Sequence, residues 1–465
     1  MRLTEDQRGV PLTAANAEAV AHYEAAIDGY LGFARDTGAH LKQAMAADPD
    51  LVMGHCTRGY FFKLFCAPTF EARARQSAEA ARAAAETVDA SPRECAHVAA
   101  LTAWCDGDVE TAVARWEAIL LDHPRDILAH KLAHFVYFYL GDAERMRDSV
   151  ARTLYAWDER VPGYGYLLGM YGFALEETGD YTAAENAGRR AVAINPGDIW
   201  AVHAVAHVME MQGRAREGID WITATAPGWQ HCNNFAYHVW WHRALFHLEL
   251  RQYDAVLALY DSHVRADQSD EYLDITNAAS LLWRLDHDGV NVGRRWAELA
   301  EKAERRKDDH LLAFIDAHFM MALAATGRDQ AARAMLASVP KDVAPAHVHG
   351  QVLAEIGIPI CAAILAYRQG EYARAVDLLL PIRYAIRRIG GSHAQRDVFA
   401  RLLIEAALRA GRFGLARALL SERAARRPSS PWTWTAYARA LDGLGDTSGA
   451  EVMRSKAQQC LERTA

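Results

Sequence analysis

The chain lacks the sequence signals by which many enzymes and membrane proteins are identified. Its 465 residues contain no Walker-type phosphate loop, no dinucleotide-binding glycine motif after a strand, and no GxSxG element. No run of about 18 uninterrupted apolar residues occurs, so we expect no membrane span. The first residues, MRLTEDQRGVPL, contain no apolar core of a secretory signal, and we therefore expect a cytoplasmic protein.

Cysteine and excess charge of one sign are also scarce. The seven cysteines are scattered and form no CxxC pair, so we expect neither a disulfide framework nor a zinc ribbon. The formal net charge of −8 gives no basic surface of the kind that nucleic acid requires, and we expect no nucleic-acid partner. The local arginine cluster at Arg423, Arg426 and Arg427 is interpreted as a solvated helix end.

Turn glycines at a regular interval are the most informative feature that is present. Steps of 34 residues separate Gly107 from Gly141, Gly179 from Gly213, and Gly411 from Gly445. In the unit that begins at Gly179, the small residues Ala184 and Ala191 precede Pro196. A turn glycine, small residues in the next helix and a closing proline are typical of a helix–turn–helix repeat with this period.

The repeat predicts an all-α fold, a right-handed superhelix of tetratricopeptide-like helix–turn–helix pairs, or α-solenoid. One helical pair cannot bury its apolar face alone, so neighbouring pairs stack and the first helix of each pair lines a concave face. We expect an irregular N-terminal segment at residues 1–16, followed by a single continuous array from 17 to 465. An irregular insertion is expected near 262–310, where the repeat pattern fits poorly.

Matching segments along nearly the whole chain give it a family resemblance. They are LVMGH (51–55), WEAILLDHPRDILAHKLAHFVYFYLGD (116–142), MRDSVAR (146–152), AVHAVAHVMEM (201–211), HVWWHRAL (238–245), DAHFMMA (316–322), and LLPIRY with IGGSHAQRDVF (379–399). In these segments the chain resembles the tetratricopeptide repeat protein 38 family. The resemblance implies an intracellular, all-helical repeat protein, and it implies little about chemistry.

Two pairs of histidines are the residues that most suggest chemistry. His203 and His207 are spaced i, i+4, and so are His238 and His242, which places each pair on one face of a helix. Glu210 continues the first stripe by one more turn. Because first helices of neighbouring repeats lie side by side, about 8–10 Å apart, the two pairs can converge on the concave surface.

Three interpretations of these histidines remain open. They could share a zinc or iron ion, with Glu210 as a ligand or base. They could instead line a polar, aromatic pocket without metal, where they bind a carboxylate or phosphate or act as acid and base near neutral pH. In the third interpretation they are structural, with their ring nitrogens satisfied by hydrogen bonds between helices.

A second set of candidates carries weaker signals. Asp316 and His318 are spaced i, i+2 and therefore do not share a helical face. Arg396 and Asp397 open a helix after a glycine pair, where they either bind an anion at the helix amides or form a structural ion pair. His55 follows Gly54 on an early first helix, where packing is the alternative to ligand binding.

We expect a repeat protein that binds a small anionic molecule or a short peptide in a histidine- and aromatic-lined groove. The first alternative is a hydrolase or acid/base enzyme that uses the groove histidines with or without a metal, and enzyme activity stays an open question. The second alternative is a protein-assembly scaffold, which would have a protein partner. No cofactor is predicted, and the alternative is a transition metal bound at the four histidines. Neither nucleic acid nor a membrane is expected as a partner.

Overall fold

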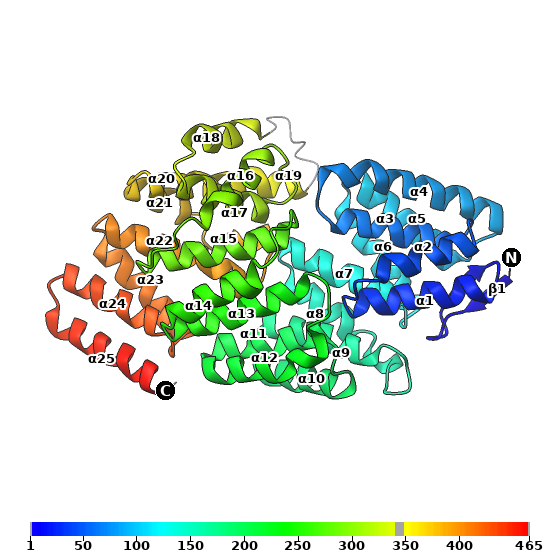
Figure 1. Ribbon diagram of the computed structural model, residues 1–465, viewed down its shortest axis with the longest axis horizontal. Coiled ribbons are helices and arrows are strands. Elements are labelled where there is room, and N and C mark those ends of the chain that lie inside the picture. Colours follow the sequence, from blue (N-terminus) through cyan, green and yellow to red (C-terminus); the bar gives the residue numbers. More distant parts are fainter. Residues whose placement is uncertain (1, 340–347, 464–465) are drawn as a thin grey trace. The chain divides into compact units, whose positions relative to one another are not determined.

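The computed structural model describes residues 2–339 and 348–463, and nearly all of this part of the chain is helical (Figure 1). Successive helices pack in antiparallel pairs, each against the next along the chain. The predicted all-α solenoid class is therefore confirmed.

The N-terminal segment differs from the irregular structure expected for residues 1–16. Two strands, β1 (Arg2–Glu5) and β2 (Pro11–Ala14), pair antiparallel. The Asp6 carboxylate closes the turn between them by accepting hydrogen bonds from the backbone N–H groups of Arg8 and Val10. The expectation for this segment was wrong because one turn residue organises a hairpin too short to show an alternating pattern.

Contacts divide the chain into two compact units, where the sequence predicted one continuous array. Unit 1 comprises residues 1–205, 225–236 and 345–348, and unit 2 comprises residues 206–224, 237–344 and 349–465. In the described chain the division passes through four helices, α11 (Ile199–Gln212), α12 (Ala215–Trp229), α13 (Phe235–Glu249) and α19 (Val348–Val352). A sequence period reports only contacts between neighbouring repeats, so it cannot locate such a division.

Unit 1 is built from paired helices that follow the hairpin. They are α1 (Ala17–Leu31), α2 (Thr37–Ala47), α3 (Val52–Leu64), α4 (Pro68–Val88), α5 (Pro92–Cys105), α6 (Val109–Asp122), α7 (Ile127–Leu140), α8 (Ala143–Ala151), the short η1 (Leu154–Ala156), α9 (Tyr164–Glu177) and α10 (Tyr181–Ile194). Their turns follow the predicted glycines, because Gly107, Gly141 and Gly179 all adopt positive φ. The residue after each glycine is an aspartate that caps the next helix, as Asp180 does by accepting from the Ala183 N–H at 3.2 Å.

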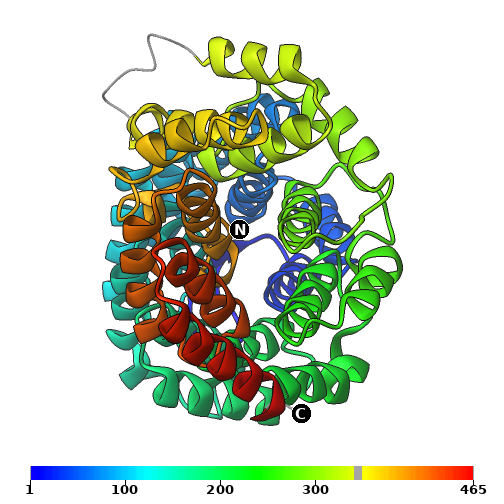
Figure 2. The same cartoon turned by 90° about the vertical axis from the view of Figure 1, so that its left-hand side faces the viewer.

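The later helices continue the same arrangement. They are α14 (Tyr253–Leu259), the π-helical η2 (Tyr260–Val264), α15 (Tyr272–His287), α16 (Trp296–Arg305), α17 (Ala313–Ala325), α18 (Asp329–Ser338), α19 (Val348–Val352), the π-helical η3 (Leu353–Gly357), α20 (Ile358–Arg368), α21 (Tyr372–Leu379), η4 (Ile386–Ile389), α22 (His393–Arg409), α23 (Phe413–Arg426), α24 (Pro431–Gly443) and α25 (Thr447–Arg463). The stretch near 262–310, where the repeat pattern fits poorly, begins inside the π-helical turn η2 and then contains the two helices α15 and α16. Figure 2 shows α22 to α25 in orange and red, one after another.

The first and last repeats of unit 2 contact each other. The Arg251 guanidinium donates a hydrogen bond to the Thr435 hydroxyl at 2.6 Å. Gly213 approaches the loop before α24 so closely that a β-carbon there would lie 2.5 Å from the β-carbon of Ser429. The repeats of this unit therefore close on themselves, and the inward side of α11 and α13 faces side chains from α22 and α23.

One helical stretch, residues 348–368, is long and apolar enough to cross a membrane by length and composition alone. Of its apolar window, 56% is buried inside the structure, and a core helix of a soluble protein passes the same test. The expectation of no membrane span stays a prediction.

Candidate functional site

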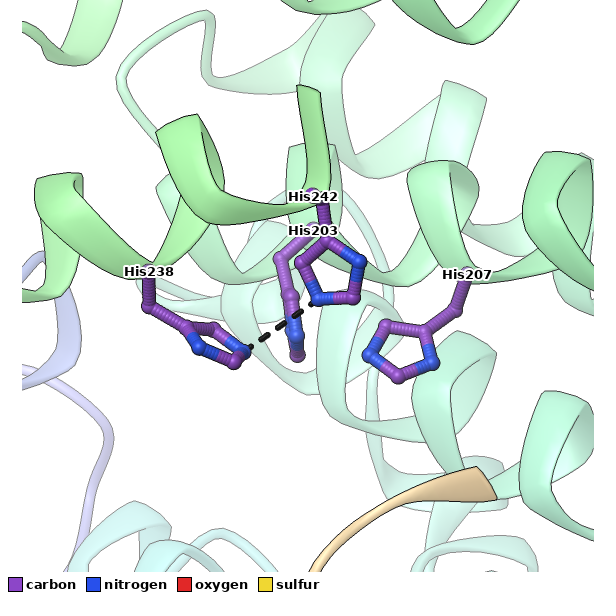
Figure 3. Close-up of side chains that lie close together, drawn as sticks. All are labelled: His203, His207, His238 and His242. Atoms are coloured by element: carbon purple, nitrogen blue, oxygen red, sulfur yellow. Dashed lines mark hydrogen bonds between the residues drawn. The ribbon is translucent and has the colours of Figure 1, made fainter. Parts of the chain in front are cut away.

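Four histidine side chains from α11 and α13 lie close together (Figure 3). One ring nitrogen from each of His203, His207, His238 and His242 lies within 4.8 Å of the other three. All four side chains are buried, with exposed fractions between 0% and 3%. The predicted convergence of the two i, i+4 pairs is thus present, but in a buried cluster rather than on an open groove.

The local sequence explains how the two helices reach this arrangement. Asp198 caps α11 by accepting a hydrogen bond from the Ala201 N–H at 3.0 Å, which fixes where the helix begins. Fully buried alanines on α11, Ala201, Ala204 and Ala206, leave room for neighbouring helices to approach. His203 and His207 then lie one turn apart on this single helix.

Hydrogen bonds to the outer ring nitrogens fix the orientation of two of the histidines. The Nδ1 of His242 lies 3.2 Å from a carboxylate oxygen of Glu210, and the Nδ1 of His238 lies 3.1 Å from the amide oxygen of Asn277. Carboxylate and amide oxygens only accept, so both Nδ1 atoms carry the proton. In the neutral rings, the Nε2 atoms of His238 and His242 therefore both carry a lone pair.

These two Nε2 atoms face each other at 3.3 Å, the contact drawn as a dashed line in Figure 3. Two lone pairs at this distance repel unless a proton or a metal ion lies between them. Two nitrogens bound at about 2.0–2.1 Å to one tetrahedral zinc ion lie about 3.3–3.4 Å apart. The donor set therefore fits a transition-metal ion in type, number and spacing.

Burial favours the neutral form of two of these imidazoles, His207 and His238. Burial lowers the pKa of His207 well below its usual range, and the neighbouring His242 and His238 lower it further, as do His393 and Arg396 of α22. Burial and the neighbouring His242 also lower the pKa of His238, against the opposing hydrogen bond that His238 donates to Asn277. The neutral imidazole is the form that binds metal ions.

A network of charged residues continues outward from Glu210. Its second carboxylate oxygen lies 3.7 Å from the Arg427 guanidinium, which also lies 3.9 Å from Asp397. Asp397 in turn accepts from Arg423 at 2.5 and 3.0 Å. Burial raises the pKa of Asp397, but Arg423 and Arg427 outweigh it and hold the pKa well below the usual range.

Two expectations for this network were wrong. Arg423 is buried, and both it and Arg427 bind carboxylates, so only Arg426 of the cluster is a solvated residue at the helix end. Asp397 pairs with these two arginines rather than with Arg396, whose guanidinium donates to the Gly391 carbonyl. Adjacent residues on a helix point in different directions, which sends Asp397 toward α23.

A cavity within unit 2 adjoins this network. Its charged lining includes Glu210, Arg284, Asp397, Arg401 and Arg427. Burial lowers the pKa of Arg284 to about 10, with Asp397 opposing, so the guanidinium stays charged at neutral pH. With Glu249, the cavity is lined by three arginines and three carboxylates, one of which, Glu210, orients His242.

The weaker candidates lie outside the cluster of four histidines. Asp316 pairs with His310, whose Nδ1 lies 2.8 Å from its carboxylate. The Nδ1 of His318 donates to the Phe314 carbonyl at 2.7 Å, and burial lowers the pKa of His318 to about 4. Both side chains are buried, and their different partners confirm that the i, i+2 spacing separates them.

His55 belongs to unit 1, and both of its ring nitrogens form hydrogen bonds with nearby residues. Its Nε2 donates to the Pro49 carbonyl at 2.8 Å, and its Nδ1 accepts from Arg58 at 3.3 Å. In the described part of the chain it joins no group that could hold a metal.

Sequence reasoning missed Asn277 and Arg427 as parts of the site. Asn277 lies 39 residues from His238, and no motif or spacing connects them. Arg427 was visible only as part of a basic cluster.

No family model matches the chain. Among solved structures it is similar to human IFIT1 in a dimer with m7Gppp-AAAA, at 13% identity over 96% of each chain with a TM-score of 0.40. It is also similar to the TPR domain of P58(IPK), at 12% identity over 80% of this chain and 99% of that chain with a TM-score of 0.22. The Naa15/Naa10 structure bound to HypK-THB gives 13% identity over 96% and 72% with a TM-score of 0.27. With TM-scores of 0.40 and below, these likenesses carry no inference about this chain's ligand or partners.

Proposed function

We propose that this repeat protein binds a divalent transition-metal ion, and through it a small anionic ligand. The metal ligands are His207, His238 and His242 of unit 2, joined by His203 one turn earlier on α11. The observation that carries the proposal is the pair of Nε2 atoms 3.3 Å apart, each on a ring whose other nitrogen donates to an oriented acceptor.

A metal ion accounts for this pair better than a shared proton does. A proton would place a positive charge on buried rings, and burial disfavours the charged form of His238. A metal ion uses both lone pairs at once. Imidazole ligands suit zinc, iron, nickel and copper, so we expect one of these ions.

The acceptors beyond the histidines match the outer groups that commonly accompany metal sites. Ligating histidines usually donate their other ring N–H to a carboxylate or carbonyl, which fixes the tautomer and ring orientation. Glu210 and Asn277 supply these acceptors for His242 and His238. Packing alone does not require the Nε2 lone pairs of two histidines to be directed at the same point.

The arginine-containing cavity beside Glu210 supports an anionic ligand, such as a carboxylate or a phosphate. A metal ion with an open coordination position would take one oxygen of that ligand. We also propose membership of the tetratricopeptide repeat protein 38 family, on the matching segments, and a cytoplasmic location.

The alternative of a metal-dependent hydrolase requires a general base. Glu210 is the carboxylate that accepts from His242, but its two oxygens are taken up by His242 and Arg427. A base engaged in this way is poorly placed to accept a proton from water, so ligand binding is the favoured function.

Metal content tests the proposal directly. We expect elemental analysis of protein purified without chelator or His tag to find about one transition-metal ion per chain. His238→Ala and His242→Ala should lose the ion, while His318→Ala, which removes an equally buried histidine outside the cluster, should retain it. A wild-type protein that binds neither zinc nor cobalt in titration would overturn the proposal, as would a His238→Ala variant with unchanged metal content.

The outer groups give a finer test on folded protein. Asn277→Ala and Glu210→Gln should each weaken metal affinity about 10–100-fold, because each change loosens one ligating ring. Cobalt titration followed by visible absorption would measure this change. Equal affinity in both variants and wild type would show that these residues do not orient metal ligands.

A further inference from the structure

A lysine on α7 of unit 1 is buried among aromatic rings. Lys131 is 1% exposed, and its Nζ lies 4.5 Å from the ring centroid of Phe33, 5.1 Å from those of Phe135 and Trp200, and 6.0 Å from that of Tyr30. Among the residues that the structure describes, none forms a hydrogen bond or an ion pair with this amine. Buried lysines are normally paired, so the arrangement calls for a reason.

Other buried polar atoms without partners surround the same lysine. Within the described chain they are the Tyr30 hydroxyl, the Trp200 indole N–H, both ring nitrogens of His134 and one carboxylate oxygen of Asp198. His134 lies against Trp200, with ring centroids 5.4 Å apart. Native interiors leave few polar atoms unsatisfied, and several in one place point to a bound molecule with polar atoms of its own.

Burial of Lys131 favours the free amine, against the charge of Asp198. Burial lowers the pKa of Lys131 to about 7, against the opposing charge of Asp198, and burial raises the pKa of Asp198 to about 6. The other titratable groups beside it stay neutral, because burial lowers the pKa of His134 well below its usual range and that of His130 to about 4. A desolvated lysine that is partly unprotonated near pH 7 is a nucleophile.

We propose that Lys131 is a carbonyl-reactive amine that forms an imine with a small aldehyde. The Nζ lone pair attacks the carbonyl carbon, a C–N bond forms, and the carbonyl π electrons move to oxygen. After a proton passes from nitrogen to that oxygen, a carbinolamine results. The Asp198 carboxyl donates its proton to the hydroxyl, the C–O bond breaks, and water leaves.

The products of this sequence are a protonated imine and the Asp198 carboxylate, so no oxidant or reductant is required. Asp198 can serve as the proton donor because one of its oxygens caps α11 while the other has no hydrogen-bond partner in the described chain. The proposal concerns unit 1 and does not depend on the metal site.

Reductive trapping tests this proposal on the full chain. The protein is incubated with benzaldehyde and sodium cyanoborohydride, and modified lysines are located by peptide mass mapping. We expect Lys131 to gain one benzyl group first, ahead of Lys63, which is paired with Glu71 at 2.6 Å, and ahead of the exposed Lys456. The trapping rate at Lys131 should be highest at about pH 6–7, where the amine and the Asp198 carboxyl share one proton, and should fall above about pH 8 as Asp198 loses its proton, whereas that of an ordinary lysine should rise about tenfold from pH 8 to 9.

Two variants complete the test. Lys131→Met should abolish the early modification, and Asp198→Asn, which keeps a helix-capping oxygen, should slow imine formation while leaving helical content unchanged. If Lys131→Met does not fold, the mapping and the pH profile of the wild-type chain decide alone. Modification of Lys131 no faster than that of Lys63, or with the pH profile of an ordinary lysine, would overturn the proposal.

Discussion

His97 of unit 1 and the pair His238 and His242 of unit 2 satisfy their ring nitrogens in different ways. In unit 1, the Nε2 of His97 lies 2.9 Å from Asp126 and its Nδ1 lies 3.1 Å from the Tyr60 hydroxyl, so both nitrogens have a partner of another residue type. In unit 2, the inner nitrogens of His238 and His242 face each other. Burial is nearly equal in the two places, so what distinguishes a proposed metal ligand from a structural histidine is where its second ring nitrogen points.

Among the single substitutions, breaking the arrangement around His97 should reduce stability most. Asp126 accepts a hydrogen bond from buried Arg93 at 2.6 Å as well as contacting His97. Asp126→Asn would leave the guanidinium buried without its counter-charge, and we expect the free energy of unfolding to fall by about 3–5 kcal/mol. Urea denaturation followed by circular dichroism would measure the loss.

The matched control is Asp142→Asn, which alters a helix-capping aspartate of the same unit whose partner Arg145 is solvent-exposed. We expect a loss of less than about 1 kcal/mol for this variant. Folded Asp126→Asn protein should keep its metal, because His97 is no ligand. Equal losses in the two variants would contradict the structural assignment of the Arg93–Asp126–His97 group.

A pH dependence follows from the buried histidines of unit 2. Burial lowers the pKa of His318 to about 4 and that of His287 to about 3, and it lowers those of His207 and His238 well below their usual range. Between these values and the unfolded value of about 6.5, the unfolded chain binds protons that the folded chain does not. Stability is therefore fully present above about pH 6.5 and is lost as the pH falls toward 4.

Each such histidine contributes a slope of about 1.4 kcal/mol per pH unit in this window. Urea midpoints measured between pH 7 and pH 5 would show it. Metal-loaded protein should lose stability more steeply than protein in chelator, because the histidines take up protons as the metal leaves. A midpoint that stays constant from pH 7 to pH 5 in both forms would show that these rings are not held neutral.

The sequence was sufficient for the repeats and for the histidine pairs, because both depend on short spacings along one chain. A turn glycine followed by a capping aspartate determines where each helix ends and the next begins, and i, i+4 spacing places His238 and His242 on one face. Asn277 and Arg427 could not be predicted, because each reaches the site only through the packing of distant repeats. The N-terminal hairpin was missed although its contacts are local. It depends on the side chain of one residue, Asp6, and its strands are too short to show an alternating pattern.

The smallest expected effect concerns His55, which shares its residue type and its place on a first helix with the cluster members. It is half-buried, burial lowers its pKa, and its Nε2 donates to the Pro49 carbonyl beside it. His55→Ala removes one local hydrogen bond, so we expect a loss of about 1 kcal/mol or less and unchanged metal content. Urea denaturation and elemental analysis would measure both. If this variant lost the metal while His238→Ala retained it, facing lone pairs would not identify the metal ligands. The direction of the second ring nitrogen would then not separate ligands from structural histidines such as His97.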